Sequence, residues 1–102
     1  MIEVVIAPEA RDDLLAIVTY LAEVAGSQTA SRWHDALWSA IDGIADFPGA
    51  GAPRPSLGKH VRINVVAPYI VVYEHEPGSA QDFVLRVLHG RRDVTRRLLG
   101  KQ

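Results

Sequence analysis

The sequence predicts an α+β fold in the order β-α-α-β-β-β, with a helical hairpin packed on one face of a small, mainly antiparallel sheet. Three observations carry this prediction. A short apolar run opens the chain, two segments with helical periodicity follow it closely, and three strand-like runs complete it. The 102 residues are enough for one compact domain, residues 1–102, and too few for two.

The N-terminal part of the chain predicts a strand followed directly by a helix. The run "IEVVIA" at residues 2–7 is typical of a strand, and Pro8 stands where a first helical residue needs no N–H. Gly26 is suited to end the helix. Between them, the apolar spacing i, i+4, i+7, i+11 predicts one buried helical face, made by Leu14, Val18, Leu21 and Ala25.

A second helix is predicted after Ser27 or Thr29, either of which could serve as its N-cap. The connection between the two helices is only a few residues long, so we expect an antiparallel hairpin. The "FPGAGAPRPSLG" stretch at residues 47–58 predicts an irregular loop after it. The apolar face of the second helix is expected to bury Trp33, Leu37, Ala40, Ile41 and Ile44.

Three strands are predicted in the second half of the chain, at residues 60–66, 69–75 and 82–89. The middle one is apolar on both faces and should be central in the sheet. In the first, Arg62 alternates with apolar residues, and in the last, Phe83, Leu85 and Val87 are expected opposite Val84, Arg86 and Leu88. One sheet face must cover the helical hairpin, and we expect Arg62 and Arg86 on the opposite, open face.

Charge is distributed unevenly along the chain. Residues 1–52 carry eight acidic and two basic side chains, whereas residues 53–102 carry nine basic and four acidic ones. This asymmetry indicates that the second half faces an anionic partner. The absence of cysteine excludes disulfides, thiolate zinc sites and cysteine nucleophiles, and the histidines show no metal-ligand spacing. We expect a cytoplasmic protein with no cofactor and no membrane segment, because neither a signal peptide nor a long apolar run is visible.

Four stretches in the expected order carry a family resemblance: "APEARDDLLAIVTYLAE", "ALWSAIDGIADFPGAGAPRP", "VRINVVAPYIVVYEHEP" and "VLRVLHGRRD". Together they resemble the RelE/ParE superfamily of toxins from type II toxin–antitoxin modules, and are closest to its ParE-like members. The resemblance covers nearly the whole chain. It implies a small toxin and a cognate ParD-like antitoxin, whose flexible and often acidic C-terminal segment folds across the open face.

The resemblance leaves two activities. RelE-like members cut mRNA on the ribosome, and ParE-like members bind DNA gyrase and block replication. A metal-independent ribonuclease would use Arg62 and Arg86 to hold the phosphate and His89 for acid–base work. Where ribosome-dependent members carry an aromatic or second acid–base residue after the histidine, this chain has Gly90. We therefore assign no catalytic residue and expect a gyrase-binding toxin rather than an enzyme, with the mRNA endonuclease and a non-toxic antitoxin-binding remnant as alternatives.

The basic residues of the second half are the predicted binding residues. We expect them to contact acidic antitoxin side chains in a hetero-oligomer, and the same basic end to contact gyrase in the free toxin. Direct nucleic-acid binding by the toxin alone is not expected. His89 is expected to end the core face of its strand. The predicted antitoxin- and target-binding residues are Arg54, Arg62, Arg86, Arg91 and Arg92.

Overall fold

The computed structural model describes residues 2–92 and 94–100 and confirms the predicted fold class. Asp93, which ends the "HGRRD" motif, lies outside the described residues. Within this part of the chain, no helix combines the length and apolarity needed to span a membrane. The elements are β1 (Glu3–Ile6), α1 (Pro8–Ala25), α2 (Ser27–Asp46), β2 (Ala52–Pro53), β3 (Val61–Val66), β4 (Tyr69–His75) and β5 (Gln81–His89).

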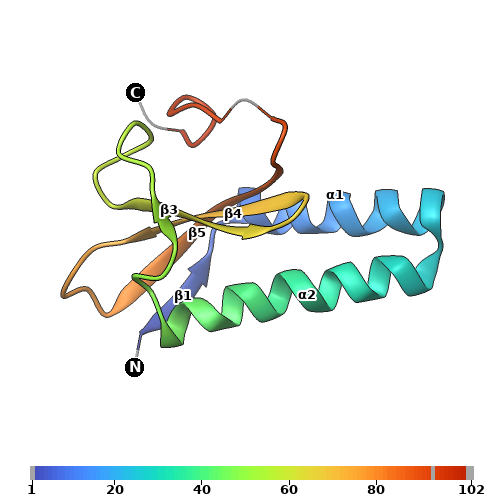
Figure 1. Ribbon diagram of the computed structural model, residues 1–102, viewed down its shortest axis with the longest axis horizontal. Helices are drawn as coiled ribbons and strands as arrows, with labels where there is room; N and C mark the ends of the chain where they lie inside the picture. The colour runs from blue at the N-terminus through green and yellow to red at the C-terminus, as the bar shows by residue number, and fades with distance from the viewer. Residues whose placement is uncertain (1, 93, 101–102) are drawn as a thin grey trace.

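The sheet has the strand order β1-β5-β4-β3-β2. The first strand pairs in parallel with the last, from Glu3 opposite Gln81 to Ile6 opposite Val84, and the other neighbours are antiparallel. Parallel pairing of β1 is possible because the helical hairpin follows it and provides a long crossover (Figure 1). The strand predicted to be central, β4, lies in the middle of the sheet. The two-residue β2 was not predicted and arises inside the expected irregular loop.

The two helices are separated by a single residue, Gly26, whose φ of 92° is a conformation that L side chains rarely adopt. The prediction that Ser27 or Thr29 caps the second helix is wrong. The helix begins at Ser27 with no side-chain cap, and the Thr29 hydroxyl instead accepts a 3.4 Å hydrogen bond from Arg32. A one-residue connection leaves no room for two capping residues, so Gly26 is both the C-cap of α1 and the N-cap of α2.

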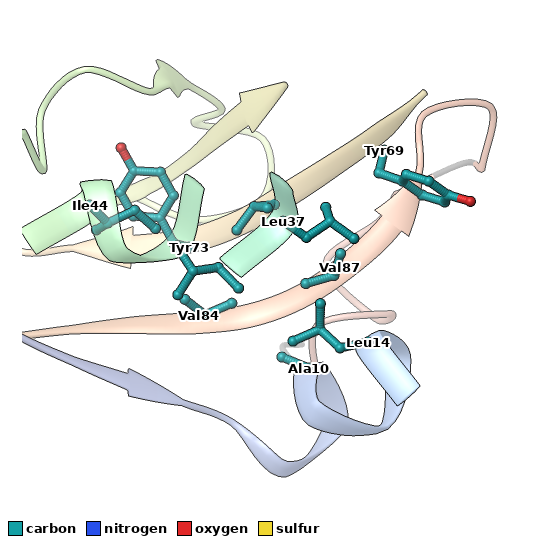
Figure 2. Close-up of a cluster of buried hydrophobic side chains, with 10 residues drawn as sticks. Ala10, Leu14, Leu37, Ile44, Tyr69, Tyr73, Val84 and Val87 are labelled. Atoms are coloured by element: carbon teal, nitrogen blue, oxygen red, sulfur yellow. The ribbon is translucent and has the colours of Figure 1, made fainter. Parts of the chain in front are cut away.

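The helical hairpin packs on one face of the sheet and forms the larger core (Figures 1 and 2). Leu14 and Leu37 from the helices meet Tyr73 and Val87 from the strands. The hairpin continues beyond the edge of the sheet (Figure 1). The predicted apolar face of α1 is therefore buried only where the sheet lies beneath it. Leu14 is buried at its near end, whereas Ala25 at its far end is exposed because no strand lies beneath it.

The reverse face of the sheet is also apolar, and the chain covers part of it. Figure 1 shows the loop between β2 and β3 and the C-terminal tail on the side of the sheet away from the helices. The expectation of an open face is therefore only partly correct. This second cluster consists of the buried Leu57, Val61, Ile63 and Val72, with Ile70, Leu85, Val94 and Leu99 packed against it.

An irregularity in β5 changes which of its side chains face the helices. Val72 pairs with Arg86, but the next residue, Tyr73, pairs with Val84, so Leu85 is an extra residue. This β-bulge interrupts the alternation of side chains between the two faces. The predicted assignment of the β5 side chains to the two faces of the sheet is therefore wrong. Two residues predicted on opposite sides both belong to the core beneath the helices, namely Val84 and Val87.

Candidate binding groove on the reverse face

A groove of about 470 Å³ lies on the reverse face of the sheet. Its floor comes from β3 and β4, one wall from the loop after β2, and the other wall from the segment after β5. We call it the reverse-face groove. The residues that line it are Arg54, Ser56, Leu57, Ile63, Val65, Ile70, Gly90, Arg92 and Val94.

Local hydrogen bonds shape the loop wall of the reverse-face groove. The Arg54 N–H donates to the Val61 carbonyl at 2.9 Å, which holds the start of the loop against β3. The Leu57 N–H then donates to the Arg54 carbonyl, also at 2.9 Å. This turn directs Leu57 inward, where it is 6% exposed, and leaves Arg54 in solvent at the rim.

The opposite wall depends on a glycine. The Gly90 N–H donates to the Pro68 carbonyl at 2.7 Å, so the chain leaving β5 turns tightly against the β3–β4 connection. A Cβ at this position would lie 3.1 Å from the same carbonyl oxygen. In the sequence analysis, Gly90 served only as evidence against a ribonuclease. The structure shows that it also lets the segment with Arg92 and Val94 form the second wall of the reverse-face groove.

The reverse-face groove combines an apolar floor with cations at both rims. Val65 on the floor is 67% exposed, and both Arg54 and Arg92 are exposed. The Arg54 side chain donates to the Pro53 carbonyl at 3.1 Å, and neither arginine forms an ion pair within residues 2–92 and 94–100. Among the residues that the structure describes, no acidic side chain lines the groove. Such a surface suits a segment that presents apolar side chains flanked by carboxylates.

Arg86 lies on the reverse-face side of β5 but is held by the chain itself. Its Nε and Nη2 donate to Asp13 Oδ2 and Oδ1 at 2.7 and 2.9 Å, and its Nη1 donates to the Leu98 carbonyl at 3.1 Å. Asp13 Oδ2 also accepts the Val87 N–H at 2.9 Å. The hydrogen bond to Asp13 raises the pKa of Arg86, so the guanidinium stays charged. Arg86 therefore ties α1, β5 and the tail together and is not a free surface cation.

The prediction that Arg62 lies on the reverse face is wrong. Arg62 is opposite Tyr73, whose side chain belongs to the core beneath the helices. Its Nη1 donates to the Gly49 and Gly51 carbonyls at 3.0 and 2.7 Å. Val61 and Ile63, which alternate with Arg62, are buried in the reverse-face cluster. The Arg62 side chain therefore lies on the face of the sheet that the helices cover. There the loop after α2 supplies carbonyl acceptors.

His89 lies at the end of β5 and is exposed. Its ring packs against Tyr69 at a centroid distance of 5.8 Å, and its Nδ1 accepts the Arg91 N–H at 3.1 Å. An imidazole nitrogen that accepts a hydrogen bond carries no proton, so this contact places the Nδ1 lone pair toward the Arg91 backbone. The three ribonuclease candidates also do not converge, because Arg62 and Arg86 lie on opposite faces and both are already hydrogen-bonded.

Several features of the site were missed from the sequence. Leu57 comes from the loop that was expected to be irregular, and Val94 comes from the tail after the last predicted strand. The contact between Asp13 and Arg86 was also missed, because 73 residues separate the two. His75 Nδ1 lies 2.7 Å from Oδ1 of the fully buried Asp82, a pair that was also not predicted. Among the described residues, no group of three histidine or carboxylate side chains is placed to bind a metal.

Comparison with known proteins places the chain in a family. The family model described as "ParE toxin of type II toxin-antitoxin system, parDE" matches residues 4–94. A solved structure described as "Chromosomal ParDE TA system from P. aeruginosa" is similar with a TM-score of 0.74 and 20% identity, over 87% of this chain and 96% of that chain. The likeness to that structure shows a shared fold. No curated protein sequence matches this chain. Because the family model spans most of its length, the chain belongs to the ParE toxin family of type II toxin–antitoxin systems.

Proposed function

We propose that this toxin is neutralised by an antitoxin of the ParD kind that places an acidic, amphipathic segment in the reverse-face groove, forming a hetero-oligomer. We further propose that the free toxin inhibits DNA gyrase. The family description names a parDE system, and the similar solved structure is described as a chromosomal ParDE TA system. Both support a protein partner for the chain.

The observation that carries the proposal is an exposed apolar floor flanked by arginines that form no ion pair with any described residue. Val65 is exposed over two thirds of its surface, although it lies in a strand and would gain from burial. Arg54 and Arg92 stand on opposite walls of the same groove. A partner with aliphatic residues between carboxylates would bury the floor and pair both arginines. Arg91 is exposed beside this wall and would add to the attraction.

The geometry also favours gyrase inhibition over mRNA cleavage. A ribonuclease of the RelE kind needs cations and an acid–base group around one phosphate. Here Arg86 is held by Asp13, and Arg62 is held by backbone carbonyls on the other side of the sheet. A toxin that acts by binding a protein target needs no such convergence.

The antitoxin proposal can be tested by charge reversal at the groove. The probe is the protein encoded in the reading frame adjacent to this chain's gene, with binding measured by titration calorimetry. Reversing two rim charges with Arg54→Glu and Arg92→Glu should weaken binding about tenfold or more and reduce its dependence on salt. The matched control reverses two exposed arginines on the helical hairpin, Arg11→Glu and Arg32→Glu. Equal effects of the two double variants would refute the groove as the binding site.

The target proposal is tested with purified toxin in two assays run side by side. We expect inhibition of supercoiling by DNA gyrase, and no cleavage of reporter mRNA on translating ribosomes. Cleavage without an effect on supercoiling would refute gyrase as the target. Intact antitoxin binding, with neither activity and no growth arrest on induced expression, would instead identify a non-toxic binding remnant.

A further inference from the structure

Two short segments on the reverse side of the sheet hold more than half of the basic residues. They are the loop between β2 and β3 and the chain after β5, both of which Figure 1 shows on the side away from the helices. In the sequence, residues 54–60 and 90–100 hold six basic side chains and one acidic one, a formal net charge of +5, and the remaining residues carry −6. The basic side chains, which we call the cationic face, are Arg54, Lys59, Arg91, Arg92, Arg96 and Arg97.

The tail, residues 94–100, presents two members of the cationic face to solvent. It is anchored at both ends, because Val94 and Leu99 pack on the apolar cluster of the reverse face. Between these anchors the backbone turns tightly, and the N–H groups of residues 98 and 99 donate to the carbonyls three residues earlier at 3.1 Å. Arg96 and Arg97 lie in this turn, and both are exposed.

A second turn, at the end of β5, presents another pair of arginines. The Arg92 N–H donates to the His89 carbonyl at 2.9 Å, and the Arg91 N–H donates to His89 Nδ1 at 3.1 Å. Both arginines are exposed, and no member of the cationic face forms an ion pair with a described residue. Backbone hydrogen bonds therefore hold both arginine pairs in place, and a preordered surface loses less conformational entropy when it binds.

The acidic residues are concentrated on the other side of the sheet. Seven of them lie on the two helices of the hairpin, which covers the opposite face (Figure 1). This separation directs the cationic face toward a polyanion and the acidic hairpin away from it, although the net charge of the chain is only −1. The seven are Glu9, Asp12, Asp13, Glu23, Asp35, Asp42 and Asp46.

We propose that the cationic face binds the phosphate backbone of duplex DNA. The inference rests on the proposed function, because it gives the toxin a direct contact with the DNA on which gyrase acts. Guanidinium groups match phosphate oxygens with two parallel hydrogen bonds, and contacts of this kind carry no sequence information. The sequence alone did not lead to this expectation, because only the structure shows that both basic segments lie on one side of the sheet.

The surroundings of the arginines favour DNA over an acidic protein as the occupant. The reverse-face groove, which suits a protein segment, is lined by Arg54 and Arg92 and not by the other four members of the cationic face. Protein interfaces depend on apolar and aromatic groups at their centre. The exposed part of the tail turn, Thr95 to Arg97, offers no such group. A duplex requires none, because it presents about one negative charge per 1.7 Å of axis and releases condensed counterions when cations approach.

Fluorescence anisotropy of a labelled DNA duplex of about 20 base pairs tests the proposal on the purified toxin, without gyrase. If Arg91, Arg92, Arg96 and Arg97 each neutralise one phosphate, the logarithm of the binding constant should fall against the logarithm of the salt concentration with a slope of about −3.6. Binding should then weaken about fiftyfold between about 50 and about 150 mM salt. Absence of binding at about 50 mM salt, or a slope near zero, would overturn the inference.

A pair of double variants identifies the surface that binds. Arg96→Ser with Arg97→Ser removes two cations from the cationic face and should reduce the slope to about −1.8. The matched control, Arg11→Ser with Arg32→Ser, removes the same charge from exposed positions on the helical hairpin and should keep the slope of the unmodified toxin. Equal slopes for the two double variants would contradict the proposal. The measurement on the unmodified toxin remains decisive if a variant folds poorly.

Two further measurements separate this inference from its alternatives. Poly-glutamate under the same conditions represents an acidic protein partner, and equal or tighter binding to it than to the duplex would overturn the choice of DNA. Inhibition of supercoiling by a toxin that does not bind the duplex would overturn the inference and leave the proposed function intact. Binding to the duplex without inhibition of supercoiling would instead overturn gyrase as the target and support the DNA contact.

Discussion

Replacing Asp13 with asparagine should destabilise the toxin far more than the same change at its neighbour. Asp13 accepts three hydrogen bonds: two from Arg86 and one from the Val87 N–H. These contacts join α1 to β5 at the point where β1 has ended and no longer supports that side of the sheet. Asparagine has a similar shape but no charge and one acceptor oxygen, so it cannot reproduce this pattern.

The size of the effect follows from burial. The side chains of Asp13 and Arg86 are 14% and 16% exposed, so the pair is largely but not fully shielded from water. Removing one partner of a buried ion pair costs roughly 3–5 kcal/mol, because a buried charge is left uncompensated. Some water reaches this pair and Arg86 keeps the Leu98 carbonyl, so we expect a loss of about 3 kcal/mol. For a domain of this size, that loss corresponds to a fall in Tm of roughly 12–24 °C.

Urea unfolding followed by tryptophan fluorescence would measure the change. With a slope of about 2 kcal/mol per molar urea, Asp13→Asn should lower the midpoint by about 1.5 M. Asp12→Asn, one residue earlier and exposed, is the matched control and should shift the free energy of unfolding by less than about 0.5 kcal/mol. If the two variants were equally stable, the ion pair would not hold α1 to β5 as argued.

Three further predictions concern the contact between β4 and the loop after α2. Tyr73→Phe should lower the free energy of unfolding by about 2 kcal/mol, because the buried hydroxyl donates to the Pro48 carbonyl and accepts the Gly51 N–H; a urea midpoint equal to wild type would contradict this. Gly51→Ala should destabilise by about 1–3 kcal/mol, since its Cβ would lie 2.8 Å from Tyr73 Cε1 and would also press on the hydroxyl. Gly49→Ala, where nothing lies within 4 Å of a Cβ, is the matched control and should leave the urea midpoint unchanged. Burial raises the pKa of Tyr73 above 10.0, so the unfolded chain releases this proton at lower pH than the folded chain. The free energy of unfolding should therefore be full below pH 10 and fall above it. Tyr73→Phe should make this fall smaller. Urea midpoints across this alkaline range that stay constant in the wild type would refute the assignment.

The elements of this toxin were largely predictable because their signals are local. Helical spacing and Pro8 defined α1, and alternation of apolar residues defined β3. Gly26 marked the end of α1, but its second role as the start of α2 was missed. Capping of α2 by Ser27 or Thr29 was predicted from local sequence preference. It does not occur, because Gly26 alone separates the two helices. Two of the predicted binding residues, Arg54 and Arg92, stand at the rims of the reverse-face groove.

In β3 the sequence by itself determined which side chains share one side of the strand, but it did not determine which side faces the helices. Arg62 was assigned to the wrong face because both sides of β3 border an apolar cluster, and only the packed structure shows which cluster took Val61 and Ile63. Arg86 was read as a free cation because its partner Asp13 is 73 residues away, and pairing over that distance exists only once α1 crosses β5. Local periodicity follows from backbone geometry within a few residues, whereas face choice, the bulge in β5 and the position of the tail depend on how distant segments bury each other's surfaces.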